Sequence, residues 1–360
     1  MPRTARVNSD KSSTYGLNVT LRSIRTKLPA PAAPGAATAV QWLTVDAESA
    51  GQRLDNVLLR LLKGVPKTHI YRVIRSGEVR LNKGRVQADS RVAEGDVLRL
   101  PPMRLAAQPD EPQAASAPPR EFPVLLEDEH LLAIDKPAGV AVHGGSGVSF
   151  GVIEQLRRAR QNGPEGAKFL ELVHRLDKET SGVLLLAKKR SALNALQDQF
   201  RARDTAKIYS ALVFGAWPDK LKVIDQALLR TTTAAGDRHV KPVAADAEGA
   251  QRSISLVRVA CRYEGATLLD VTLKTGRTHQ IRVHLASHGH PIVGDPKYGD
   301  FARNKTLTKA HGFERMFLHA RLLAFDHPAG GARVTLESPL PVACVQLCET
   351  LAAAARHCPP

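Results

Sequence analysis

The stretch His174-Arg175-Leu176-Asp177-Lys178-Glu179-Thr180-Ser181-Gly182 is the most informative part of this chain. It places one carboxylate, Asp177, among cations and small polar residues, directly ahead of the apolar segment 183–187, which is typical of a strand. A carboxylate held against an arginine keeps its charge and can act as a nucleophile or a base on an electron-poor carbon. Alone, the stretch is compatible with several chemistries.

Length and composition indicate a two-domain protein that binds a polyanion. The chain has 360 residues, more than one average domain, and 43% of them are hydrophobic, which is enough for a sizeable core. Lys and Arg together number 51 against 35 for Asp and Glu, a net charge of +16. Nucleic acid is the commonest polyanionic partner of such a protein. A basic but merely solvated surface is the alternative.

The cysteines and the hydropathy pattern predict a cytoplasmic protein with no membrane segment. The four cysteines (261, 344, 348 and 358) lack zinc-type spacing and are interpreted as reduced thiols. No apolar run approaches the roughly 20 residues that a membrane helix needs. The first 40 residues contain a single acid, Asp10, so they fit either a basic RNA-binding arm or a mitochondrial transit peptide.

A small helical module with short strands is predicted after this leader. Apolar residues at helical spacing indicate a first helix: Leu54, Val57, Leu58, Leu61 and Leu62. A second helix is expected from Pro66, with Gly77 as its stop. Its predicted inward face and its exposed basic face are Ile70, Val73 and Ile74, and Lys67, Arg72 and Arg75, respectively. A hairpin turn at 82–84 and a strand over 97–100 follow.

This arrangement over about residues 52 to 101 resembles the S-four-type (αL) RNA-binding module of ribosomal proteins. The resemblance implies that Lys67, Arg72 and Arg75 contact phosphates without reading sequence. A small structural domain with solvated charges is the alternative.

The remainder of the chain predicts an α+β domain. A Pro-, Ala- and Gln-rich linker precedes it at 104–121. We expect strands at 131–135, 183–188, 207–214, 267–273 and 332–336, and helices at 149–160, 190–203 and 278–288. We expect the connection 215–250, which carries Gly, Pro and charge, to be surface loops. Strands and helices in this non-alternating order favour α+β over a doubly wound parallel sheet.

Two later segments complete a resemblance with the first. They are Lys207-Ile208-Tyr209 and Gly276-Arg277-Thr278-His279-Gln280-Ile281-Arg282. Together with the Asp177 stretch, and in this order, they resemble the RluA-type pseudouridine synthases, and most closely the RluC branch. The resemblance implies a pseudouridine synthase fold, with a central mixed, largely antiparallel sheet flanked by helices. It also implies that the protein flips uridines of large-subunit ribosomal RNA, cleaves C1′–N1 and rejoins the base through C5, without metal or other cofactor.

The resemblance assigns roles to individual residues. Asp177 is implied to be the essential aspartate, acting at C1′, at the base or on a sugar proton; the sequence leaves these three open. Tyr209 is implied to stack under the flipped base, a contact worth about 1–3 kcal/mol. Arg282 is implied to pair with Asp177 and keep it ionised. Arg175 is implied to enter the vacated base stack, with a phosphate contact as the alternative.

Other residues of these segments receive lesser roles. We interpret Arg277 and His279 as RNA-contacting residues or as supports of the site. His284 and His288 are spaced i, i+4, but no Glu follows His284 and no further ligand pattern is present, so a zinc site is not predicted. The Gly-rich loop at 136–147 lacks a dinucleotide-binding pattern and is predicted to be flexible.

The predicted organisation is a leader at 1–40, an αL-type domain at 41–103, a linker at 104–121 and a catalytic domain at 122–360. We expect a monomer whose partner is ribosomal RNA, in mature or assembling subunits. Two alternatives remain. One is a non-catalytic ribosome-assembly factor that only binds RNA. The other is a glycoside hydrolase, which would pair Asp177 with a second carboxylate, and Glu179 is the nearest in sequence.

Overall fold

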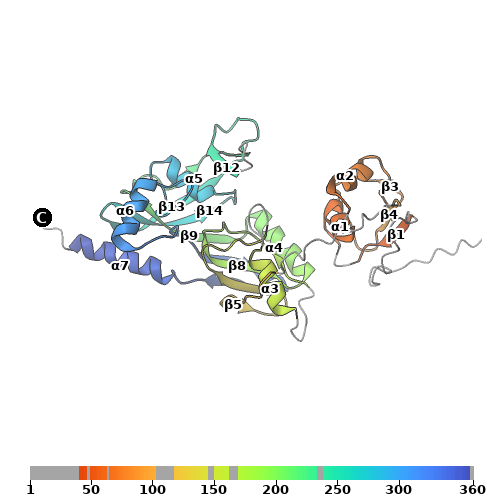
Figure 1. Cartoon of the computed structure of the whole chain (residues 1–360), viewed down its shortest axis with the longest axis horizontal. Helices are drawn as coiled ribbons and strands as arrows, with labels where there is room; N and C mark the ends of the chain where they lie inside the picture. The colour runs from red at the N-terminus through yellow and green to blue at the C-terminus, as the bar shows by residue number, and fades with distance from the viewer. Residues whose placement is uncertain are drawn as a thin grey trace, which may run out of the picture. The chain divides into compact units, whose positions relative to one another are not determined.

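The computed structural model describes residues 40–46, 49–62, 65–102, 117–144, 150–161, 169–232 and 238–356. The chain separates into two compact units, and the division falls between Ala114 and Ala115 (Figure 1). Except for Val40, the leader predicted at 1–40 lies outside the described residues, as does most of the linker. The domain boundaries given above therefore stay predictions.

The first unit packs two helices against a four-stranded sheet. Its strands follow the order β1-β4-β2-β3. Its elements are β1 (Gln41–Thr44), α1 (Leu54–Leu61), α2 (Lys67–Arg75), β2 (Arg80–Leu81), β3 (Gly84–Arg85) and β4 (Val97–Leu100). The predicted inward face of α2, namely Ile70, Val73 and Ile74, is buried. The predicted hairpin turn joins β2 to β3, where Asn82 and Lys83 both adopt positive φ, of 47° and 68°.

The second unit is built around a ten-stranded mixed sheet. The main path is β10-β13-β14-β9-β15-β8-β6-β5, with β16 beside β15 and β7 beside β8. The strands are β5 (Val124–Glu127), β6 (Leu131–Lys136), β7 (Glu171–Leu172), β8 (Ser181–Ala187), β9 (Ala206–Phe214), β10 (Val223–Asp225), β13 (Ile254–Tyr263), β14 (Ala266–Leu273), β15 (Leu318–Asp326) and β16 (Arg333–Glu337).

One parallel strand pair joins the two halves of this sheet. Within the described residues, β15 pairs with β8 in parallel, and the other ladders of the sheet are antiparallel. At this junction Ala320 lies opposite Gly182. A Cβ on Gly182, whose φ is +110°, would lie 2.3 Å from the Ala320 carbonyl oxygen. Only glycine allows this approach, which brings the loop containing Asp177 to the centre of the sheet.

Helices cover both faces of the sheet, as the alternating side chains of its strands require. They are α3 (Val152–Arg160), α4 (Arg190–Ala202), α5 (Gln280–Ser287), α6 (Phe301–His311) and α7 (Val342–Arg356). On β8, Leu184 packs with α3, whereas Leu185 packs with α4 on the opposite face. On β9, Ala211 packs with α5 and Leu212 with α7. The predicted α+β class, with a mixed sheet flanked by helices, is confirmed.

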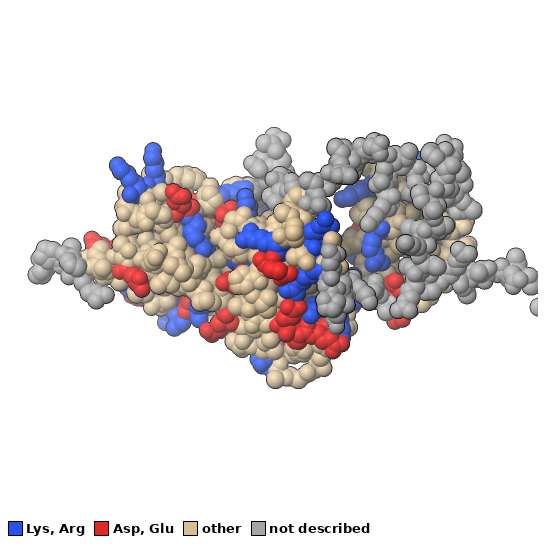
Figure 2. All heavy atoms as spheres, turned by 60° about the horizontal axis from the view of Figure 1, so that its bottom comes forward, with Lys and Arg blue, Asp and Glu red and all other residues tan. Residues whose placement is uncertain are grey.

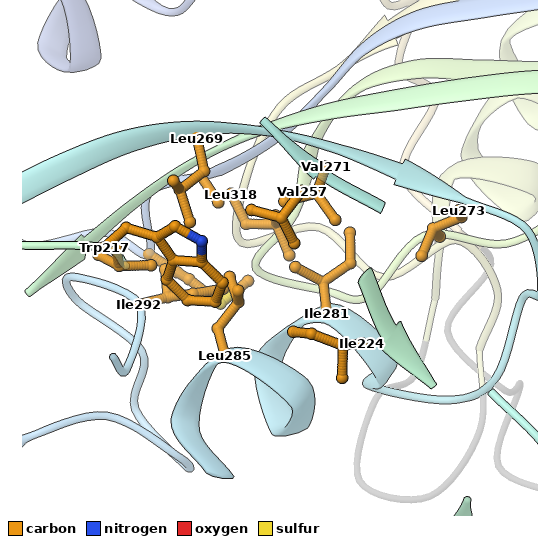
Figure 3. Packing of buried hydrophobic residues seen from close by; sticks show 13 residues of the cluster. Trp217, Ile224, Val257, Leu269, Val271, Leu273, Ile281, Leu285, Ile292 and Leu318 are labelled. Atoms are coloured by element: carbon orange, nitrogen blue, oxygen red, sulfur yellow. The ribbon is translucent and has the colours of Figure 1, made fainter. Parts of the chain in front are cut away.

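Helix α5 is short, and it is held in place by a large apolar cluster. Ile281 and Leu285, four residues apart, point from α5 toward Leu269 and Val271 of β14, and Trp217 closes one end of the cluster (Figure 3). The side chains of Ile281 and Leu285 are 4% and 0% exposed, so packing fixes the orientation of the helix. Arg282, the next residue on α5, is thereby presented to the site described below.

The prediction that 215–250 forms only surface loops is wrong. This segment contains β10 and a two-stranded ribbon of β11 (Leu228–Thr232) and β12 (Arg238–Pro242). The ribbon lacks a clean apolar alternation, and tertiary contacts support it instead: Leu228 and Val240 pack with Val283 of α5. Helix α6 was not predicted, because it has no buried residue and hence no helical periodicity. Within the described part of the chain, no helix is long and apolar enough to span a bilayer.

Candidate active site

The three sequence segments singled out above converge on one cavity of about 340 Å³. Asp177 comes from the loop before β8, Tyr209 from β9 and Arg282 from α5, and all three line the cavity. Arg175, Arg277 and His279 line it as well. Lining a common cavity shows that these residues are neighbours, whereas their roles remain those that the resemblance implies.

Asp177 and Arg282 form an ion pair at the wall of the cavity. Arg282 Nη1 donates to Asp177 Oδ2 at 3.2 Å. The two side chains differ in exposure, at 27% for Asp177 and 5% for Arg282. The carboxylate therefore faces the cavity while its partner is buried behind it. Such a charge-assisted hydrogen bond fixes the direction of the carboxylate.

Asp295, which the sequence analysis did not identify, holds Arg282 from the other side. Arg282 Nε and Nη2 donate to the two carboxylate oxygens of Asp295, each at 2.8 Å. Asp295 also accepts from the backbone N–H groups of Lys297 and Tyr298. Burial works to raise the pKa of Asp295, but its bonds with Arg282 outweigh burial and hold that pKa below its ordinary value. A bidentate pair of this kind sets the plane of the guanidinium.

His279 lies beside the same carboxylate. Its Nε2 is 4.0 Å from Asp177 Oδ2, and its Nδ1 is 2.8 Å from the Tyr298 hydroxyl, which accepts from the Val240 N–H at 3.1 Å. The backbone of His279 is left-handed, with φ of 53°, and α5 therefore begins at Gln280. Burial lowers the pKa of His279 even though Asp177 acts to raise it. The imidazole is consequently neutral near pH 7.

Tyr209 forms part of the cavity wall from the middle of the sheet. On β9 it lies opposite Val271 on one side and Ala320 on the other. Tyr209 packs against two apolar clusters, one that includes residues of α5 and one that includes residues of α3, so its ring has a fixed position. Burial, with a smaller contribution from the Asp177 charge, raises the pKa of Tyr209. Its hydroxyl is therefore protonated across the physiological range.

Lys136 anchors the loop that carries the catalytic candidate. It is fully buried at the end of β6, and its ammonium group donates to the carbonyls of Pro137 and Val140 at 2.8 Å and of Lys178 at 3.1 Å. Burial lowers its pKa to about 7, against the charges of Glu179 and Asp177. The described part of the loop predicted to be flexible is thus fastened to the residue next to Asp177. Residues 145–147 of that loop lie outside the described residues.

Of the two histidines spaced i, i+4, His284 lies on α5 and has a structural role. His284 is buried, with Nδ1 2.9 Å from Ser255 Oγ and Nε2 3.1 Å from the Gln226 carbonyl. Both ring nitrogens are therefore engaged with protein groups. In the described part of the chain, no group of three or more His, Cys, Asp or Glu side chains is arranged to hold a metal ion.

The basic residues predicted on the first unit are on its surface. Lys67, Arg72 and Arg75 are exposed on α2. Arg75 also lines a cavity of about 630 Å³ in that unit, together with Arg53 and Arg85. The predicted exposed face of α2 is confirmed, whereas phosphate binding by these residues stays a prediction.

Comparisons with known proteins assign the two units. An S4 domain profile matches residues 52–98, and an RNA pseudouridylate synthase profile matches residues 130–287. The chain is 48% identical over 305 residues to ribosomal large subunit pseudouridine synthase C of Yersinia pestis, covering 84% of this chain and 92% of that protein. Identity to the Escherichia coli K12 protein of the same name is 47%, covering 84% and 93%. The chain belongs to the pseudouridine synthase family.

Solved structures agree with this assignment. The chain matches human RNA pseudouridylate synthase domain containing 4 at a TM-score of 0.53 and 28% identity, over 64% of this chain and 93% of that one. It also matches human RNA pseudouridylate synthase domain containing 1 at a TM-score of 0.50 and 25% identity, over 66% of this chain and 96% of that one. The resemblance to this family, and within it to RluC-type enzymes, is therefore confirmed, as is the enzyme class.

The residues that sequence reasoning missed had a weak local signal. Asp295 and Tyr298 lie in Gly294-Asp295-Pro296-Lys297-Tyr298-Gly299, a short polar segment punctuated by Gly and Pro. A lone acid in such a turn is usually a backbone cap, and Asp295 does cap the backbone at Lys297. Its second function, holding Arg282, depends on a side chain from another element. Glu179, the partner of the hydrolase alternative, is not among the described residues lining the cavity.

Proposed function

We propose that this pseudouridine synthase converts specific uridines of large-subunit ribosomal RNA to pseudouridine. The observation that carries the proposal is the grouping of Asp177, Tyr209 and Arg282 around one cavity, with Asp177 paired to Arg282 at 3.2 Å. The names of the relatives give the substrate class: they are ribosomal large subunit enzymes. The S4 domain supplies a second RNA-binding element.

The reaction rearranges one nucleotide and needs no net redox change. The C1′–N1 bond breaks, the base turns over, a C1′–C5 bond forms, and the net proton transfer is from C5 to N1. Asp177, oriented by Arg282, supplies the carboxylate on which cleavage depends. The uridine must first leave its stack, at a cost of a few kcal/mol. Tyr209 offers an aromatic face to the extruded base, and Arg175, exposed at the rim, takes the vacated place.

The binding partners follow from the same proposal. Lys67, Arg72 and Arg75 on the S4 domain, with Arg277 and His279 at the cavity, contact the RNA. The protein acts as a monomer in the cytoplasm, where bacterial ribosomal RNA is modified, on free or assembling large subunits. The bacterial source of the relatives supports the compartment, and a sedimentation measurement tests the monomer.

Incubation with unmodified large-subunit RNA tests the activity. Pseudouridines are mapped by carbodiimide treatment and primer-extension stops. We expect discrete new stops with the wild type and none with Asp177→Asn, which retains the shape of the side chain. Binding of the RNA by Asp177→Asn, measured by filter retention, should stay close to that of the wild type. Absence of stops with the wild type, or equal stops with Asp177→Asn, contradicts the proposal.

The same incubation distinguishes the enzyme from the two alternatives, a non-catalytic assembly factor and a glycoside hydrolase. A non-catalytic assembly factor would bind the RNA and give no stops with either protein. A glycoside hydrolase would release free uracil, whereas an isomerase leaves the base in the RNA chain.

A further inference from the structure

A second cavity adjoins the active site of the catalytic unit. It has a volume of about 490 Å³ and shares Phe200, Lys207, Gly276 and Arg277 with the active-site cavity. It extends away from Asp177 between the end of α4 and the segment that follows β14. We call this second cavity the basic groove, defined by its five cationic residues: Arg201, Arg203, Lys207, Lys274 and Arg277.

The basic groove carries an excess of positive charge that the protein does not neutralise. Arg201 pairs with Asp198 on the same helix. Among the described residues, neither Arg203 nor Lys274 has a carboxylate oxygen within 4.0 Å, and no acidic residue lines the groove. On the face shown in Figure 2, by contrast, basic and acidic side chains lie among one another. The excess of positive charge in the groove is therefore stronger evidence for an anion-binding surface than the net charge of the chain is.

Backbone structure fixes the positions of these cations. Helix α4 ends at Ala202, and the next residue, Arg203, adopts a left-handed φ of 68° while its N–H donates to the Gln199 carbonyl. On the facing side, the Lys274 N–H donates to the Ile254 carbonyl at 3.1 Å, and Arg277 Nε donates to the Arg252 carbonyl at 3.4 Å. The charges are thus brought together by rigid elements before any ligand arrives, which lowers the cost of ordering them on binding.

Lys207 lies where the basic groove meets the active site. Its ammonium group is 5.0 Å from the centre of the Phe200 ring. Burial lowers the pKa of Lys207, and the charge of Arg203 lowers it further. The positive charges of Lys207 and Arg203 repel one another, and an anion placed between them relieves the repulsion.

We propose that the basic groove binds backbone phosphates of the RNA strand next to the extruded uridine. The proposal rests on the function proposed above and adds Arg203, Lys207 and Lys274 to the RNA-binding residues. A nucleotide whose base occupies the active-site cavity remains linked to its neighbours, so its strand must leave along a wall of that cavity. The wall with Lys207 and Arg277 opens into the groove. Contacts to phosphates position the strand and do not read its sequence.

The test uses the full-length protein and an unmodified large-subunit RNA transcript. Arg203→Gln and Lys274→Gln each remove one exposed charge, and Lys305→Gln removes an exposed charge from α6, which lines neither cavity. The dissociation constant is measured by filter retention at several salt concentrations. Each groove variant should weaken binding about 5- to 10-fold and reduce the slope of log Kd against log salt by about 1, whereas Lys305→Gln should do neither.

Turnover distinguishes a binding role from a structural one. The two groove variants should raise KM by a similar factor, with the loss confined to KM, and should melt at the wild-type temperature. The proposal for the basic groove is overturned if Arg203→Gln and Lys274→Gln bind with the affinity and salt slope of the wild type. It is also overturned if Lys305→Gln changes them equally. A wild type that binds the RNA but forms no pseudouridine overturns the proposed function and not the groove, because the binding measurement does not depend on turnover.

Discussion

The guanidinium of Arg282 donates two hydrogen bonds of 2.8 Å to Asp295 and one of 3.2 Å to Asp177. Asp295 is 1% exposed, whereas Asp177 is 27% exposed. The more strongly bound partner is thus the buried one. Arg282 is held in place by Asp295 and reaches Asp177 with its remaining Nη1, so the position of the Asp177 carboxylate depends on a carboxylate that does not line the cavity.

We expect Asp295→Asn to impair catalysis more than RNA binding. Removing one partner of a buried ion pair costs about 3 kcal/mol of stability. It also frees the guanidinium to shift, and a misplacement of about 1 Å near reacting atoms lowers the rate about 100-fold. Single-turnover kinetics and RNA filter binding measure the two effects.

Asp270→Asn is the matched control for this variant. Asp270 also pairs with arginines, Arg258 and Arg321, but it lines no cavity among those described. Its turnover should equal that of the wild type. A wild-type rate for Asp295→Asn would show that Asp295 does not position Arg282 for catalysis.

The ring of Tyr209 should contribute to substrate binding and its hydroxyl to turnover, and two substitutions separate these effects. Tyr209→Phe keeps the aromatic face, so its KM should match that of the wild type. Tyr209→Leu loses the stacking surface, worth about 1–3 kcal/mol, and should raise KM about 5- to 100-fold. Because burial keeps the phenol protonated, its O–H can donate a hydrogen bond to the reacting nucleotide, and we expect Tyr209→Phe to lower kcat. If Tyr209→Leu bound RNA and turned over as Tyr209→Phe does, stacking on this ring would be refuted.

Stability of the catalytic unit should fall in mild acid because of His174. The Leu185 N–H donates to His174 Nε2 at 3.1 Å, so that nitrogen must be unprotonated. Burial, with the nearby Lys207 charge, lowers the pKa of His174 from 6.5 to about 4. Between these two pH values the unfolded chain binds a proton at His174 that the folded protein does not. The contribution of neutral His174 to stability is therefore lost as the pH falls from 6.5 toward 4.

The free energy of unfolding should decrease by about 2 kcal/mol between pH 6.5 and pH 4.5 because of His174. It is measured as the difference in free energy of unfolding between the wild type and His174→Asn across this range. Other buried histidines contribute equally to both proteins and cancel. A difference that does not change with pH would show that His174 titrates normally in the folded protein.

Gly182→Ala should be among the most damaging single methyl additions. The new Cβ would lie 2.3 Å from the Ala320 carbonyl oxygen at the parallel junction of β15 and β8, and φ is +110°. Strain and overpacking together should cost about 3 kcal/mol or more. Gly265→Ala is the control, because Gly265 has φ of +70° but no atom within 4 Å of its added Cβ. It should cost about 1 kcal/mol. Equal melting temperatures for the two variants would contradict this account.

Local sequence patterns predicted those elements whose apolar spacing is self-contained. Helices α1 and α2 show their buried face in their own residues, such as Leu54 and Ile70. The β11–β12 ribbon and α6 do not, because the ribbon is supported by contacts with other elements and α6 has no fully buried residue. A pattern can reveal only the burial that it encodes within one segment.

The sequence by itself determined the family of this protein, through three separated motifs, and with it the candidate acid, tyrosine and arginine that the structure places around one cavity. Only the tertiary structure revealed that Asp295 holds Arg282, that Lys136 fastens the loop beside Asp177, and that cations from α4 and from the end of β14 share one groove. These relationships join side chains from elements that are distant in sequence. Their distances are set by how the whole sheet and its helices pack, and no local spacing records that packing.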